Sequence, residues 1–100
     1  MPDHQKIKTL IGFAIRAGKV IIGRSAVLAA LEKNQIRLVV ISEDASEKLD
    51  FLQSPDAHVR SIRFGNKEEL GAWFGRKQVA VFAITDAQFS KAVENAVRNQ

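Results

Sequence analysis

Two predominantly apolar runs constrain the fold of this 100-residue chain more than any other feature. They are IRLVVIS, at residues 36–42, and VAVFAIT, at residues 79–85. Both have the length of a strand and are rich in β-branched residues. A strand-length apolar run of this kind is typical of a strand that is buried on both faces in an α/β sheet. The two runs therefore predict a sheet whose central strands are covered by helices on both sides.

Helical and strand-like patterns alternate along the chain. Apolar side chains at helical spacing predict helices over residues 5–17, 26–34, 46–52, 67–75 and 87–99. A short strand over residues 19–23 and a weaker strand over residues 58–64, nearer an edge, complete the set. This alternation predicts one domain over residues 1–100, of the α/β class: a three-layer α/β/α sandwich with a mixed sheet of about four strands.

Residues that favour helix ends stand at the expected boundaries. Gly18 and Gly75 follow helical patterns, where a C-cap glycine belongs. Ser25 and Asp86 precede helical patterns, and we expect each to cap the N-terminus of its helix.

The charge of the chain favours a polyanionic partner. The net charge is +4, and it divides into +5 for residues 1–42, −4 for residues 43–56 and +3 for residues 57–100. A small basic domain is a candidate for binding RNA or DNA. An acidic segment between two basic ones predicts that one polar end of the molecule faces away from the nucleic acid.

Composition excludes several classes of protein and site. The chain has no Cys, which excludes disulfides, thiolate zinc sites and cysteine nucleophiles. No apolar run reaches the ~18 residues that a membrane span needs, and no secretory signal is evident. We expect a cytoplasmic protein with no membrane partner.

Catalytic signals are weak. His4 and His58 have no metal-ligand partner at usable spacing. Neither a P-loop, nor a dinucleotide-binding glycine pattern, nor a serine nucleophile elbow is present. The enzyme alternative depends on Glu43, Asp44 and Asp86, of which Glu43 and Asp44 follow a central strand. We predict a non-enzymatic protein without metal or cofactor.

Two basic turns are stronger candidates for function. The first basic turn, residues 23–25, places Arg24 beside a glycine at the start of a helix, where free N–H groups favour a phosphate or a base-edge acceptor. The second basic turn, residues 75–78, holds Arg76 and Lys77 after a helix. Trp73 and Phe74 precede it and offer rings on which bases stack, although aromatics at helical spacing more often belong to a core. The alternative is that both turns are capped helix ends with solvated charges.

The chain resembles a known family. The strings IGFAIRAGKVIIG (11–23), LVVISEDAS (38–46), ELGAWFG (69–75) and VAVFAITDAQFSKAV (79–93) are similar to the ribosomal protein L7Ae/L30e superfamily, and most to its bacterial YlxQ-like branch. The resemblance implies an α/β/α fold that binds kink-turn RNA, with ribosomal or other structured RNA as partner and the ribosome as a further one. It implies contacts from the helix that begins after Gly23 and from a loop near the end of the fourth helix.

One part of the family pattern is replaced. Strong RNA binders of the family have Gly-x-Asn-Glu-x-x-Lys from the glycine equivalent to Gly23. Ser25, Ala26 and Ala29 stand here at the Asn, Glu and Lys positions. Each lost bidentate base contact removes about 1–3 kcal/mol of discrimination. We therefore expect weaker or altered RNA specificity.

The resulting prediction is a monomeric, RNA-binding protein. The predicted RNA-binding residues are Gly23, Arg24, Ser25, Lys33, Arg37, Gly75, Arg76, Lys77 and Gln78, with Arg16 and Lys19 nearby. The alternative is a protein–protein adaptor of the translation machinery, in which Val27 and Leu28 add to an exposed apolar patch. The RNA hypothesis requires the two basic turns to meet in space without carboxylates between them.

Overall fold

The structure, a computed structural model, describes residues 4–45 and 59–98. In chain order the elements of this part are α1 (His4–Arg16), β1 (Val20–Ile22), α2 (Arg24–Glu32), β2 (Leu38–Ile41), β3 (Arg60–Arg63), α3 (Lys67–Trp73), β4 (Val81–Ile84) and α4 (Ala87–Arg98). The expected helix over residues 46–52 lies outside the described residues.

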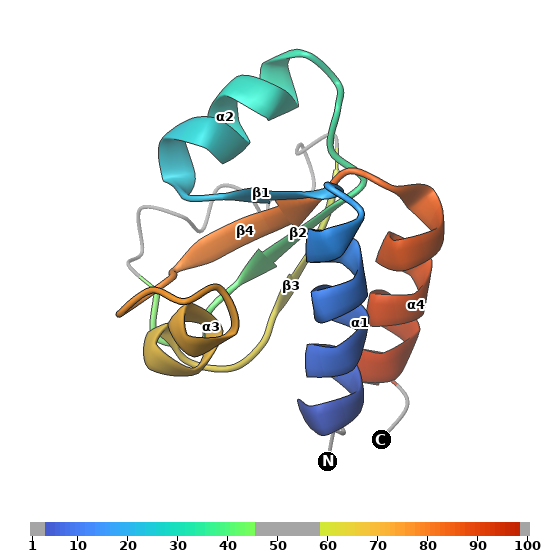
Figure 1. Ribbon diagram of the computed structural model, residues 1–100. Helices are drawn as coiled ribbons and strands as arrows, with labels where there is room; N and C mark the ends of the chain where they lie inside the picture. Colours follow the sequence, from blue (N-terminus) through green and yellow to red (C-terminus); the bar gives the residue numbers. More distant parts are fainter. Residues whose placement is uncertain (1–3, 46–58, 99–100) are drawn as a thin grey trace.

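The described strands form one mixed sheet in the order β1-β4-β2-β3 (Figure 1). β4 runs antiparallel to both of its neighbours, and β2 runs parallel to β3. The two apolar runs supply β2 and β4, the central strands, and all of their residues are buried. The weaker pattern supplies β3 at an edge. The predicted sheet is therefore confirmed, including which strands are central.

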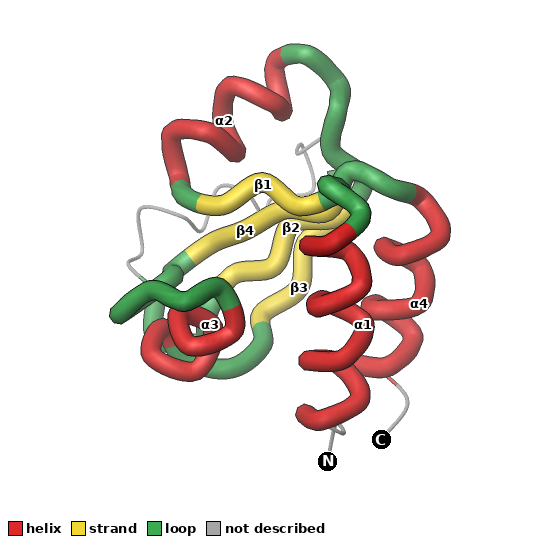
Figure 2. The backbone as a smooth tube through the Cα atoms, in the orientation of Figure 1, coloured by secondary structure: helices red, strands yellow, loops and turns green. Residues whose placement is uncertain are grey.

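Helices cover both faces of the sheet (Figure 2). Along β4, Phe82 and Ile84 belong to the apolar cluster that also contains buried residues of α1, α3 and α4. Val81 and Ala83 belong to the opposite cluster, which contains Val27 of α2. Successive residues of a strand point to opposite faces, so one uninterrupted run serves both clusters. The three-layer α/β/α sandwich is confirmed.

The helix ends follow from particular residues. Gly18 has φ 71° and follows α1, and the Lys19 N–H donates to the Ala14 carbonyl at 2.9 Å. This bond pattern closes a helix with a left-handed residue, as predicted for Gly18. The Asp86 carboxylate accepts from the Phe89 N–H at 2.9 Å and caps α4, again as predicted.

The predicted cap of α2 is wrong. Gly23, with φ 95°, is the N-cap, and no side chain accepts a capping hydrogen bond. The chain leaves β1 through a backbone conformation that glycine adopts most easily, so it is already helical at Arg24. Ser25 consequently lies within the first turn of α2.

Candidate nucleic-acid interface

The first basic turn leaves backbone donors free at the start of α2. The first hydrogen bond within the helix runs from the Val27 N–H to the Gly23 carbonyl at 3.0 Å. The helix therefore offers no acceptor to the N–H groups of Arg24, Ser25 and Ala26. Because no side chain caps this end, the donors and the positive end of the helix dipole face outward, which suits a phosphate or another anion.

The second basic turn is folded back onto α3. Gly75, with φ 69°, follows the helix, and the Arg76 N–H donates to the Gly71 carbonyl at 2.8 Å. Further along, the Val79 N–H donates to the Lys67 carbonyl at 2.9 Å. These bonds fix the path of the turn, while its side chains from Gly75 to Gln78 are exposed. The exposed side chains of Arg76 and Lys77 therefore extend from a backbone that hydrogen bonds to α3 fix in position.

Gly71 was not among the predicted site residues, yet it determines where this turn lies. A Cβ at Gly71 would stand 2.7 Å from the Lys77 carbonyl oxygen and 2.8 Å from that of Arg76. Only a hydrogen fits there, so glycine allows the turn to lie against α3. The signal in the sequence was a glycine inside a helical pattern, where it lowers helix stability by about 1 kcal/mol relative to alanine.

The two basic turns lie at the same end of the sheet. The Gly23 N–H donates to the Val81 carbonyl at 3.0 Å, and Ile22 is paired with Phe82. The start of α2 is thereby fixed beside the start of β4, the strand into which the second basic turn leads. Figure 1 shows the start of α2 and the α3–β4 connection at the same end of the strands. Turns about 50 residues apart along the chain thus share one edge of the molecule.

Lys33 and Arg37 are not brought to this end. Lys33 is the C-cap of α2, and the Arg37 N–H donates to the carbonyl of Ile84, the last residue of β4. The Thr85 N–H donates to the Lys19 carbonyl, which places Lys19 at that far end too. At about 3.3 Å per residue, the length of β4 separates the two ends by about 10 Å. The predicted residues thus divide into two groups.

One carboxylate approaches the second basic turn. Glu68 lines an open cleft of about 690 Å³ together with Lys77 and Gln78. Within residues 4–45 and 59–98, Arg24, Arg76 and Lys77 form no ion pair. No carboxylate of the described residues therefore pairs directly with the cationic side chains of the two turns.

Two of the three carboxylates of the enzyme alternative have structural partners. Asp44 accepts from the Lys67 N–H at 2.9 Å at the start of α3, and Asp86 caps α4. Desolvation opposes ionisation of Asp44, but hydrogen bonding to the Lys67 N–H, to Ser42 and to its own backbone, together with the nearby Lys67 ammonium, outweighs desolvation and lowers the pKa of Asp44 below its ordinary value. A lowered pKa favours the charged form that holds the helix end.

The two aromatic residues before the second basic turn pack inward. The Trp73 ring lies 5.8 Å from that of Phe64, and the Phe74 ring lies 4.9 Å from that of Phe82. Both side chains are half-buried against the core. The core interpretation of this pair is therefore the better one, which leaves cations and backbone donors as the groups of the candidate interface.

Metal-ligand clusters and membrane-spanning helices are both absent from the described ranges. In residues 4–45 and 59–98, no three His, Asp or Glu side chains gather as metal ligands. In the same ranges no helix is both long and apolar enough to cross a bilayer.

Comparison with known proteins gives a consistent result. The sequence profile of the Ribosomal protein L7Ae/L30e/S12e/Gadd45 family matches residues 5–94. The chain is 29% identical over 98 residues to the RNA-binding protein YlxQ of Enterococcus faecium, which covers 95% of this chain and 94% of that protein. It is 33% identical over 86 residues to the large ribosomal subunit protein eL8 of Thermoplasma volcanium, covering 82% and 71%. A solved structure of a protein of unknown function from Bacillus halodurans C superposes with a TM-score of 0.80 at 28% identity, covering 92% and 96%.

Proposed function

Because this chain belongs to the ribosomal protein L7Ae/L30e/S12e/Gadd45 family, we propose that it binds structured RNA through the two basic turns at one end of its sheet. The observation that carries the proposal is the hydrogen bond from Gly23 to Val81, which holds both turns at that end. The names of the relatives, an RNA-binding protein and a ribosomal protein, support an RNA partner.

The proposed contacts follow from the chemistry of the two turns. The free N–H groups at the start of α2 bind a phosphate or a base edge. The Arg24 guanidinium donates two hydrogen bonds to a phosphate or to a guanine edge. Arg76 and Lys77, with the amide of Gln78, hold the backbone of an adjacent nucleotide. Lys33 and Arg37 are not part of this proposed surface, because they lie at the far end of the sheet.

We propose that the ligand is a bent RNA of the kink-turn kind. The protein binds this RNA weakly or with altered specificity. Ala26 and Ala29 have no side-chain donor or acceptor, and Ser25 has one hydroxyl. Backbone and phosphate contacts then supply most of the affinity, and such contacts are strongly salt-dependent. We also propose that the protein is a cytoplasmic monomer of one domain and that it associates with the ribosome.

The adaptor alternative has lost its structural motivation. Val27 is 1% exposed and faces the sheet, and Leu28 packs against the same apolar cluster. These side chains form no exposed patch on α2.

The test is a titration of a kink-turn RNA and of a plain duplex of equal length at the same moderate salt. We expect tighter binding of the kink-turn RNA, and about tenfold weaker binding, or about 1.4 kcal/mol, in Arg24→Glu and in Arg76→Glu. Lys8→Glu makes the same charge change on the exposed face of α1 and is the matched control. Equal losses in all three variants would reduce the interaction to general electrostatics, and undetectable binding of both RNAs would refute the proposal.

A further inference from the structure

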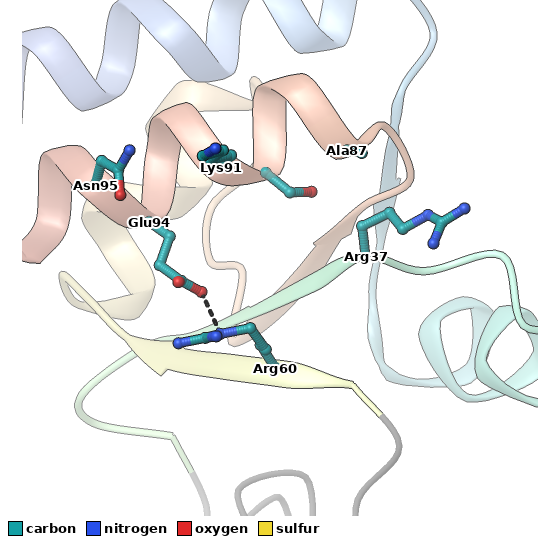
Figure 3. Close-up of a pocket in the computed structure, with 7 residues that line it drawn as sticks. Arg37, Arg60, Ala87, Lys91, Glu94 and Asn95 are labelled. Carbon is teal, nitrogen blue, oxygen red and sulfur yellow. Dashed lines mark ion pairs between the residues drawn. The ribbon is translucent and has the colours of Figure 1, made fainter.

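A second group of cations surrounds a cavity at the far end of the sheet. The cavity has a volume of about 370 Å³ and lies between α4 and the side of the sheet formed by β2 and β3 (Figure 3). It is lined by Arg37, Arg60, Ala87, Ser90, Lys91, Glu94 and Asn95. Its volume falls within the range of small-ligand pockets, about 300–1,000 Å³.

The charge of this cavity is positive after its internal pairing. Glu94 Oε2 lies 2.8 Å from Arg60 Nε, and Glu94 Oε1 lies 3.8 Å from a guanidinium nitrogen of Arg98. Figure 3 shows Arg60 directed at Glu94, whereas Arg37 extends away from that pair. Among residues 4–45 and 59–98, neither Arg37 nor Lys91 forms an ion pair. Both side chains are exposed, and no carboxylate of the described residues neutralises their charge beside the cavity.

One residue that lines the cavity has a buried hydroxyl that lacks a partner among the described residues. Ser90 is 7% exposed, and its Oγ makes no hydrogen bond. The hydroxyl of a helical serine commonly donates to the carbonyl four residues earlier. Here the Ser90 N–H donates to the Asp86 carbonyl, and the Ser90 hydroxyl does not. Buried hydroxyls are nearly always satisfied in folded proteins. An acceptor oxygen on a ligand in this cavity would satisfy this one.

From the cavity, its free cations and its unpaired hydroxyl, we propose that this is a second site, one that binds a phosphate group. Arg37 and Lys91 supply the charge, Ser90 donates one hydrogen bond, and Glu94 keeps the Arg60 guanidinium in place beside the ligand. The Asp86 carboxylate already accepts from the Phe89 N–H at the start of α4, and the donors proposed here are side chains. The phosphate belongs either to a free nucleotide or to an RNA backbone. This inference does not rest on the proposed function, because the two sites lie at opposite ends of the sheet.

The test follows the backbone amide resonances of the full-length ¹⁵N-labelled protein during titration. The probes are inorganic phosphate, adenosine 5′-monophosphate and a short single-stranded RNA. We expect saturable shifts at Arg37, Ser90 and Lys91 with at least one probe. Saturation by phosphate and the monophosphate but not by RNA identifies a free phosphorylated ligand, and saturation by RNA alone identifies a backbone phosphate. Absence of saturable shifts at these residues with all three probes overturns the proposal.

Two variants separate ligand binding from folding. We expect Lys91→Gln and Ser90→Ala each to weaken the saturating probe about fivefold, which is the loss of about one hydrogen bond. Lys8→Gln removes the same charge on the exposed face of α1, outside both proposed sites, so binding of phosphate or monophosphate should stay unchanged. Ser90→Ala should fold with an unchanged or raised melting temperature, because it removes an unsatisfied buried hydroxyl.

The outcomes distinguish this proposal from the RNA proposal. If Ser90→Ala lowers the melting temperature and leaves probe affinity unchanged, the hydroxyl is structural and the phosphate site is refuted. Loss of kink-turn binding in Arg24→Glu reports on the other end of the molecule, so either proposal can fail while the other stands.

Discussion

At the scale of single residues, a hydrogen in place of a side chain determines the position of the second basic turn. Gly71 lies inside α3, where glycine lowers helix stability relative to alanine by about 1 kcal/mol. Its missing Cβ is the space in which the backbone of residues 76–78 lies. Gly12, inside α1, has no atom within 4 Å of the same position. The two helix glycines therefore make a matched pair.

We expect Gly71→Ala to lower the free energy of unfolding by about 1–3 kcal/mol, because the new methyl group overlaps backbone atoms that must move. RNA affinity should fall with it, since the second basic turn is displaced. Gly12→Ala should raise the free energy of unfolding by about 0.5–1 kcal/mol and leave RNA affinity unchanged. Urea unfolding and RNA titration of both variants are the measurements, and similar behaviour of the two would contradict the packing argument.

Asp44 gives a prediction about pH. Its pKa in the folded protein lies below 3.8, so folding favours the carboxylate. The stabilisation is complete above the ordinary pKa and is lost as the pH falls through the folded value. Asp44→Asn keeps an acceptor for the Lys67 N–H without the charge. Urea unfolding at pH 7, 5, 4 and 3 should show wild type more stable than the variant at pH 5 and above, with the difference shrinking towards pH 3. A difference independent of pH would assign the effect to hydrogen-bond geometry alone.

At the scale of elements, the helix ends separate capping from binding. Asn66 accepts from the Glu69 N–H at 2.8 Å and caps α3, whereas Ser25 lies inside α2 and caps nothing. The preference of serine for N-cap positions predicted a cap at Ser25 from sequence. The positive φ of Gly23 started the helix earlier, and no propensity scale contains that information.

We therefore expect Asn66→Ala to lower the free energy of unfolding by about 1 kcal/mol, and Ser25→Ala to change it by less than about 0.5 kcal/mol. RNA binding should respond in the opposite order, because Ser25 lies at the proposed interface. Thermal unfolding of both variants, beside the RNA titration, checks this. Equal destabilisation by the two substitutions would restore Ser25 as a structural cap.

At the scale of the whole molecule, the RNA-binding prediction concerns two turns acting on one ligand. If Arg24 and Arg76 each neutralise a phosphate of the same RNA, removing both charges should reduce the slope of log affinity against log salt by about 1.4–1.8. The measurement compares wild type with Arg24→Gln/Arg76→Gln across a series of salt concentrations, with Lys8→Gln as the control of equal charge type. An unchanged slope in the double variant would mean that neither guanidinium contacts the RNA backbone.

The sequence by itself determined the local structure and the layers. The apolar runs of β2 and β4 identified the central strands. A strand covered on both faces shows no alternation of apolar and polar residues, because neither of its faces meets water. Gly18 and Asp86 marked helix ends through backbone conformation and a short-range hydrogen bond, which depend only on neighbouring residues. The two basic turns were also visible as local sequence.

Only the tertiary structure decided which cations share a surface. Lys33 and Arg37 flank the same helix as Arg24 in sequence, but α2 runs from one end of the sheet to the other and places them at the far end. The pairing of β1 with β4 brought the two basic turns to one end, and the contact of Gly71 with residues 76–78 set the path of the second. These relations depend on strand order and register, which arise from long-range packing and which local sequence does not specify.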